Sequence, residues 1–192
     1  MRICVFCGSS PGHDSQYVNA ARALGTLLTD RNIGLVYGGA SVGLMGAVAD
    51  AVLDKGGEVI GVMPQGLVGF EVAHKKLGDL RIVGSMHERK ALMAELSDAF
   101  IALPGGIGTL EETFEMLTWA QLGFQSKPVA LLDIGGFFEK LSGFLDHVVD
   151  EGFLRPEHRG MLLRETDPKA LLDRIAAYQA PALVKWMNRD QT

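Results

Sequence analysis

Residues 99–112 read Ala-Phe-Ile-Ala-Leu-Pro-Gly-Gly-Ile-Gly-Thr-Leu-Glu-Glu, and this stretch decides the fold. The apolar run from Ala99 to Leu103 has the length of a buried strand, and helical periodicity begins soon after the glycines. Because these glycines lack a Cβ atom, a ligand can approach the backbone closely. A helix that starts near Thr109 presents unpaired amides and the positive end of its dipole. The stretch therefore predicts a strand, a turn and a helix that bind one phosphoryl group.

Two better-known glycine motifs do not occur in the sequence. A Walker-type phosphate loop needs Gly-Lys-Ser or Gly-Lys-Thr, and neither tripeptide is present. The dinucleotide fingerprint needs G-x-G-x-x-G after the first strand, whereas residues 8–12 read Gly-Ser-Ser-Pro-Gly. NAD binding and ATP hydrolysis are therefore not expected.

Glu112 has two interpretations at this point. Thr109 and Glu112 have the S/T-x-x-E spacing of a capping box, in which the acid only accepts a hydrogen bond from a backbone amide. Alternatively, the carboxylate performs chemistry beside a bound phosphorylated ligand. The spacing does not separate these roles, and the two can coexist. Amides and the dipole at a helix start favour the charged form, so we expect Glu112 to stay ionised.

Further strands alternate with helices along the chain. Arg2–Gly8 is apolar on both faces, as expected for a parallel strand covered by helices on each side. Gly34–Tyr37 precedes a second glycine-rich loop, Gly38–Gly46, which leads into a helix over 44–53. Both glycine loops should lie at one edge of a parallel sheet and form a nucleotide-sized site, although tight turns and close helix packing also use glycine. The other predicted strands are Glu58–Met63, Leu80–Val83, Val129–Leu132 and an edge strand at Leu162-Leu163.

This alternation predicts an α/β fold, a doubly wound, Rossmann-like and mostly parallel sheet of six or seven strands with helices on both faces. The 192 residues suit a single domain over 1–192 that contains this nucleotide-sized site, with a loose tail over 181–192. The net charge is −5 without a basic run, which argues against a nucleic-acid partner. No apolar segment approaches about 20 residues and no signal peptide is evident, so we expect a cytoplasmic protein without a membrane partner.

Cys4 and Cys7 have the C-x-x-C spacing of a redox pair. They lie in one apolar run, and residues three apart in a strand point to opposite faces. Packing in the core is therefore the expected role of both thiols. The five histidines are scattered and no H-E-x-x-H occurs, so no metal site is predicted.

The stretch Pro-Gly-Gly-Ile-Gly-Thr-Leu-Glu-Glu over 104–112 resembles the signature of the LOG ("lonely guy") family. Three other stretches are similar to that family: Gly38–Gly46, Met86–Ala91 and Thr118–Gly123. The resemblance extends from about Arg2 to Arg159. It implies a hydrolase that cleaves the N-glycosidic bond of adenosine 5′-monophosphate or N6-modified (cytokinin) riboside 5′-monophosphates to a free base and ribose 5-phosphate. It also implies a homodimer or higher homo-oligomer that uses no cofactor.

The resemblance assigns roles to individual residues. Arg89 and Glu112 match catalytic residues of the family. Arg89 and Lys90 fall in the early turns of a predicted helix, where the helix dipole disfavours positive charge. Either an anion lies near these two residues or both face solvent. The residues implied in substrate binding are Glu71, Arg89, Lys90, Gly106, Ile107, Gly108, Thr109, Leu110, Glu111, Glu112 and Thr118. The two glycine loops add Ser9, Gly39, Gly43 and Met45 as further candidates at the rim.

Two other classes of protein stay open on the sequence. Sequences similar to this family include non-catalytic carriers of nucleotides or of the molybdenum cofactor, which have related glycine loops. Such sequences also often bear a lysine decarboxylase label. That activity requires pyridoxal phosphate on a lysine, and no lysine in this sequence is marked for that role.

Overall fold

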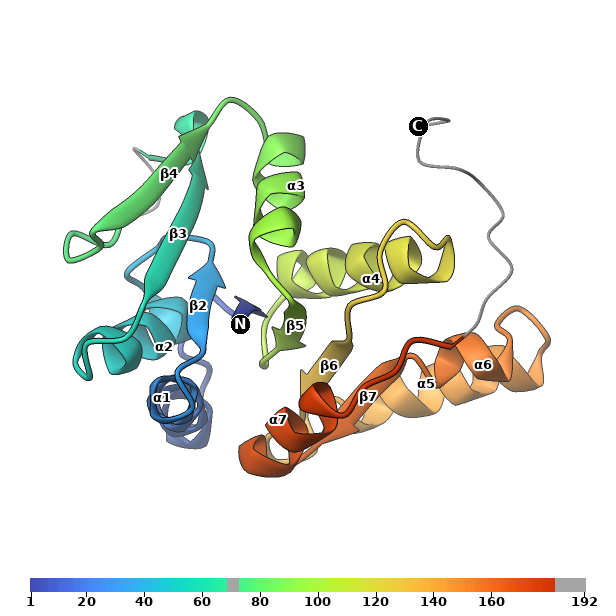
Figure 1. Cartoon of the computed structure of the whole chain (residues 1–192). Coiled ribbons are helices and arrows are strands. Elements are labelled where there is room, and N and C mark those ends of the chain that lie inside the picture. The colour runs from blue at the N-terminus through green and yellow to red at the C-terminus, as the bar shows by residue number, and fades with distance from the viewer. Residues whose placement is uncertain (69–72, 182–192) are drawn as a thin grey trace.

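A seven-stranded sheet in which every pairing is parallel forms the centre of the molecule (Figure 1). The computed structural model describes residues 1–68 and 73–181. In chain order the strands are β1 (Arg2–Phe6), β2 (Gly34–Tyr37), β3 (Val59–Pro64), β4 (Asp79–Val83), β5 (Ala99–Ala102), β6 (Val129–Leu132) and β7 (Leu162–Glu165). Their spatial order is β4-β3-β2-β1-β5-β6-β7, so the doubly wound fold and the edge strand at 162–163 are confirmed.

Helices connect the strands and cover both faces of the sheet. They are α1 (Ser15–Asp30), α2 (Gly43–Leu53), α3 (Met86–Leu96), α4 (Ile107–Gln121), α5 (Glu139–Asp150), α6 (Pro156–Arg159) and α7 (Pro168–Ala176), with a 3-10 turn, η1, at Gln65–Leu67. Among the described residues, no helix is both long and apolar enough to cross a bilayer.

Two apolar cores lie on opposite faces of the sheet. Leu24 of α1, Val48 of α2 and Leu171 of α7 belong to one core. The other core contains residues of α3, α4 and α5. Cys7 lies in the first core and Cys4 in the second, both as free buried thiols, which confirms that the C-x-x-C pair cannot meet across the strand.

The order of the strands creates a crevice above β1 and β5. From β1 the chain adds β2, β3 and β4 on one side, and β5 then pairs with β1 on the other side. Because successive connections diverge at this point, the loops at the carboxyl ends of β1 and β5 leave room for a ligand. The two loops are joined directly, since the amide of Gly8 donates to the carbonyl oxygen of Pro104 at 3.1 Å.

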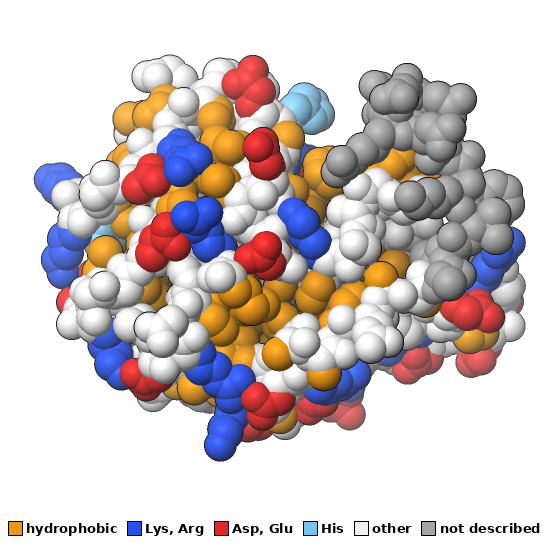
Figure 2. Space-filling view, in the orientation of Figure 1, with side chains coloured by type: hydrophobic (Ala, Val, Ile, Leu, Met, Phe, Trp, Pro, Cys, Tyr) orange, Lys and Arg blue, Asp and Glu red, His pale blue; other side chains and the backbone are white. Residues whose placement is uncertain are grey.

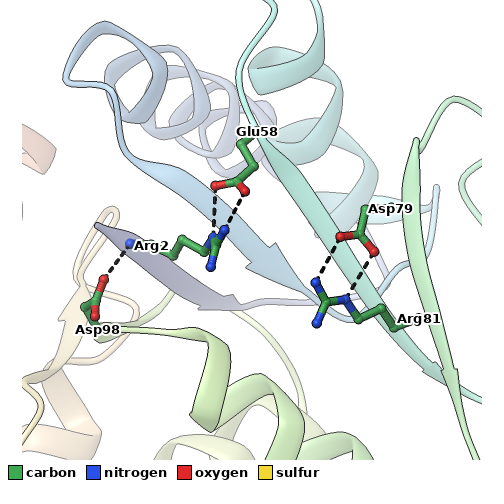
Figure 3. A network of polar contacts seen from close by, with 5 residues as sticks. All are labelled: Arg2, Glu58, Asp79, Arg81 and Asp98. Atoms are coloured by element: carbon green, nitrogen blue, oxygen red, sulfur yellow. Dashed lines mark hydrogen bonds and ion pairs between the residues drawn. The ribbon is translucent and has the colours of Figure 1, made fainter.

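Ion pairs fix the opposite, amino-terminal edge of the sheet. Figure 3 shows the Arg2 guanidinium against the carboxylate of Glu58, with N–O distances of 2.9 and 2.8 Å, and the Arg2 amide on Asp98 at 2.8 Å. Arg81 and Asp79 pair within the edge strand β4 in the same view. Figure 2 shows Lys and Arg side chains interspersed with Asp and Glu on the face that it presents, without a broad basic patch.

A capping box with the S-x-x-E spacing is present at the start of α3. Ser85 is the N-cap, and its hydroxyl accepts a hydrogen bond from the amide of Glu88 at 3.1 Å. The Glu88 carboxylate in turn accepts from the amide of Gly84 at 2.7 Å. These bonds fix the start of the helix that carries Arg89 and Lys90.

Candidate functional site

The helix α4 starts two residues earlier than the sequence predicts, and the first capping box does not form. Gly106 is the N-cap and no side chain caps the helix. Thr109 therefore occupies the third helical position, where its hydroxyl cannot act as an N-cap. The capping interpretation of Glu112 is wrong, so another role must account for its position.

The start of α4 is open toward the outside of the protein. Leu110 donates to the carbonyl oxygen of Gly106 at 3.2 Å, which leaves the preceding amides of residues 107–109 at the free end of the helix. A Cβ atom added at Gly106 or Gly108 would meet no heavy atom within 4 Å. Space and free donors therefore coincide at this end of α4, an arrangement that suits an anion.

The other glycines of the rim serve close packing between loops. A Cβ atom at Gly43, whose φ is +57°, would lie 2.3 Å from the carbonyl carbon of Ser9. At Gly105 it would lie 2.1 Å from the hydroxyl oxygen of Thr109. Gly39 has a φ of +82° and accepts a hydrogen bond from the amide of His74. Ser9 is exposed at the rim, whereas Gly39 and Met45 are buried beneath it.

The Glu112 side chain is half-buried on α4. Burial raises the pKa of Glu112 to about 7, and the positive charge of Arg89 acts in the opposite direction. The expectation that the helix start keeps this carboxyl firmly ionised is therefore wrong, because the cost of removing the charge from water outweighs the favourable dipole. A carboxyl with a pKa near neutrality can exchange protons readily at physiological pH.

Arg89 is buried and bonded to the backbone of two neighbouring strand ends. Its side chain comes from α3, and only 7% of the residue is exposed. The Nε group donates to the carbonyl oxygen of Val62 at 3.1 Å, and Nη2 donates to the carbonyl oxygen of Gly38 at 3.2 Å. The two carbonyls that hold the guanidinium are neutral, and its positive charge acts on Glu112. The alternative of a solvated surface face is wrong for this residue.

Lys90, the next residue, lies in a different environment. Its ammonium group bonds Glu111 at 2.7 Å and Glu115 at 3.0 Å, and 10% of the side chain is exposed. Although burial opposes the charge, these carboxylates raise the pKa of Lys90. The nearby anion expected from the position of Lys90 in an early helical turn is therefore provided by the protein, as the carboxylates of Glu111 and Glu115. Lys90 links α3 to α4, while the charge of Arg89 acts on Glu112.

The remaining candidates lie at different distances from the start of α4. Ile107 is 81% exposed in the first turn, next to the free amides, and Glu111 faces Lys90. Thr118 lies on α4 about 16 Å along the axis from Ile107, and its hydroxyl donates to the carbonyl oxygen of Phe114 at 2.7 Å. The structure therefore does not bring Thr118 to the same end of the helix. Glu71 lies outside the described residues.

Sequence reasoning missed three groups that shape this site. They are the carbonyl oxygens of Gly38 and Val62, and the carboxylate of Glu115 on Lys90. Any residue can supply a backbone carbonyl, so the sequence carries no signal for the first two. The spacing from Glu111 to Glu115, one helical turn, is the signal that could have identified the third. Among the described residues, no group of three or more His, Cys, Asp or Glu side chains is placed to hold a metal ion.

Comparison with protein families and curated proteins gives strong matches. The family model described as "Possible lysine decarboxylase" matches residues 45–175. A rice protein (Oryza sativa subsp. japonica), described as the probable cytokinin riboside 5′-monophosphate phosphoribohydrolase LOGL9, is 52% identical over 92% of this chain and 78% of its own. The cytokinin riboside 5′-monophosphate phosphoribohydrolase LOG3 of Arabidopsis thaliana is 51% identical over 92% of this chain and 82% of its own.

Similar solved structures are more distant in sequence. The molybdenum cofactor binding protein from Rippkaea orientalis has a TM-score of 0.70 at 22% identity, over 92% of this chain and 95% of that one. The molybdenum cofactor carrier protein from Chlamydomonas reinhardtii has a TM-score of 0.68 at 20% identity, over 92% and 98%. At such low identity these matches establish only the Rossmann-like fold. Evidence about function comes from the relatives that are about 50% identical.

Proposed function

Because this chain belongs to the LOG family of cytokinin riboside 5′-monophosphate phosphoribohydrolases, we propose that Glu112 and Arg89 carry out its reaction at the start of α4. The enzyme hydrolyses the N-glycosidic bond of a nucleoside 5′-monophosphate. The hydroxyl of water goes to C1′ of the ribose, and the remaining proton goes to the departing base. The observation that carries the assignment of residues is the half-buried carboxyl of Glu112, on which the charge of Arg89 acts, on the helix whose first amides have no intrahelical partner.

Glu112 acts on the sugar in this proposal. Cleavage of the glycosidic bond develops positive charge on the ribose ring, and a nearby carboxylate stabilises that charge. With a pKa of about 7, the same carboxylate can also accept a proton from the attacking water. Electrostatic stabilisation is largest where water is excluded, which is the environment that the raised pKa reports.

Arg89 and the start of α4 bind the anionic part of the substrate. The amides of Ile107, Gly108 and Thr109 are the donors proposed for the 5′-phosphate, with open space in front of Gly106 and Gly108. Arg89 is always charged and cannot be a general base, so we assign it to holding the substrate and assisting departure of the base. Lys90 and Glu111 support this site by joining α3 to α4.

Turnover of defined nucleotides tests the proposal. Purified protein is incubated with adenosine 5′-monophosphate and with its N6-prenylated analogue, and the free base is measured by chromatography. The Glu112→Gln variant should fold and lose at least about 100-fold in kcat. The matched control is Glu95→Gln, an exposed glutamate on α3, which should keep wild-type turnover. Near-normal hydrolysis by Glu112→Gln would reject the assigned role.

We further propose a homodimer located in the cytoplasm. Half-buried apolar side chains of Leu110, Phe114 and Trp119 line α4 beside the core, and Figure 2 shows apolar surface in the middle of the face that it presents. Two unpaired buried thiols fit a reducing compartment. Light scattering coupled to gel filtration would test the dimer, and a monomer mass at micromolar concentration would contradict it.

A further inference from the structure

Gly38 lies against the guanidinium of Arg89, in the glycine-rich loop that follows β2. The carbonyl oxygen of Gly38 accepts a hydrogen bond from Nη2 of Arg89 at 3.2 Å. A Cβ atom added at Gly38 would lie 2.1 Å from that same nitrogen and 2.4 Å from Cε of Met45. The absence of a side chain at this position therefore determines where the guanidinium can lie.

The backbone conformation does not explain the glycine. Gly38 is not among the described glycines with a positive φ, whereas its neighbour Gly39 is. An alanine would therefore fit the backbone at 38 and would conflict only with its two spatial neighbours. Both neighbours are the far ends of long side chains, so the protein can accommodate alanine by moving Arg89 and Met45. The fold survives such a change, but the position of Arg89 does not.

The two carbonyl contacts also fix the direction of the remaining Arg89 donors. A guanidinium has five N–H groups in a planar fork. Nε is used by Val62 and one hydrogen of Nη2 by Gly38, while Nη1 faces the sulfur of Met86 at 3.7 Å. With one edge of the plane fixed on β3 and the loop after β2, the other edge points in a single direction. The charge that acts on Glu112 comes from this fixed group.

We propose that Gly38 is a positioning residue, whose missing side chain and carbonyl oxygen, together with the carbonyl oxygen of Val62, hold Arg89 in its working orientation. This inference rests on the proposed function for its effect on turnover. It adds to the proposed site a residue of the loop after β2. A misplacement of about 1 Å in a catalytic group can reduce turnover about 100-fold.

The test compares Gly38→Ala with Gly143→Ala. Gly143 lies on α5, and a Cβ atom there meets nothing within 4 Å, so this variant controls for the glycine-to-alanine change itself. Gly38→Ala should lower kcat about 10- to 100-fold. The ratio kcat/KM should fall at least as much, because the displaced Arg89 also holds the substrate. Turnover by Gly38→Ala within twofold of Gly143→Ala would overturn the proposal.

A double-mutant cycle separates positioning from a general structural role. In an Arg89→Ala background only the conflict with Met45 remains, so Gly38→Ala should change the remaining turnover less than about twofold and should lower the melting temperature by less than it does in the wild-type background. In the wild-type background the same change should lower the melting temperature. Equal effects of Gly38→Ala in both backgrounds would overturn the inference.

The melting temperatures keep this test distinct from that of the proposed function. A wild-type protein that releases no base would reject the proposed function. The melting-temperature cycle would still report whether Gly38 and Arg89 are coupled, because it needs no substrate.

Discussion

Replacing Glu112 by glutamine should stabilise the folded protein at alkaline pH while it removes activity. Burial raises the pKa of Glu112 from its ordinary value of 4.5 to about 7. Between these pH values the folded protein keeps a proton that the unfolded chain has released, so the free energy of unfolding falls as the pH rises. The penalty is absent below both values and is complete above them, where it amounts to about 3 kcal/mol. Glutamine carries no charge, so the Glu112→Gln variant does not pay this penalty.

Urea denaturation at pH 5 and pH 8 measures this effect. The gain in the free energy of unfolding of Glu112→Gln over wild type should rise from about 1 kcal/mol at pH 5 to about 3 kcal/mol at pH 8. The exposed control Glu95→Gln should show no such dependence on pH. Wild-type kcat/KM should rise with pH up to about 7, because the carboxylate is the active form.

Two results would refute the reasoning. A stability gain that is equal at both pH values would show that Glu112 is not desolvated in the folded protein. A kcat/KM that does not change between pH 5.5 and pH 8 would show that its ionised form is not required. The first result concerns the site's environment and the second its chemistry, so each can fail independently.

Three further predictions concern stability and are checked by denaturant unfolding of purified variants. Lys90→Met should lower the free energy of unfolding by about 1–2 kcal/mol, because it leaves two acceptors without their donor; an unchanged value would contradict the α3–α4 link. Tyr37→Phe should leave stability unchanged or increase it by up to about 1 kcal/mol, since the buried hydroxyl has no hydrogen-bond partner among the described residues; a clear loss would reveal a partner. Asp133→Ala should cost about 3 kcal/mol, because its buried carboxylate binds both a backbone amide and an arginine. The exposed partner of Arg2 in Figure 3 provides the comparison, and Glu58→Ala should cost less than Asp133→Ala.

The strands were the most predictable part of the fold. The runs at β1, β2 and β5 are apolar on both faces, and all of their residues from Ile3 onward are buried in the parallel sheet. The ends of helices and strands were predicted less accurately, as α4 shows. Gly106 adopts an extended conformation with φ of −90° and ψ of −158°, and the helix begins at the next residue. The sequence spacing had instead favoured Thr109 as the N-cap.

The surroundings of the proposed site residues could not be predicted from the sequence. The pKa of Glu112 depends on how much of its surface other elements cover, and the local sequence around a helix start does not contain that information. The partners of Arg89 are main-chain oxygens from segments 27 and 51 residues away. The sequence predicted that an anion lies near Lys90. It did not predict that the anion is a pair of carboxylates of α4, because this depends on how α3 packs against α4.

The central position of β1 has a consequence for synthesis of the protein on the ribosome. One side of β1 is completed early by β2, but its other side is filled only by β5, starting at Ala99. At about 5–20 residues per second, the first strand waits for roughly 5–20 s with an unpaired edge. A nascent chain stopped before residue 99 would expose that apolar edge to other chains and would lack half of the crevice. Completion of the active centre and protection of the most vulnerable edge therefore occur in the same step.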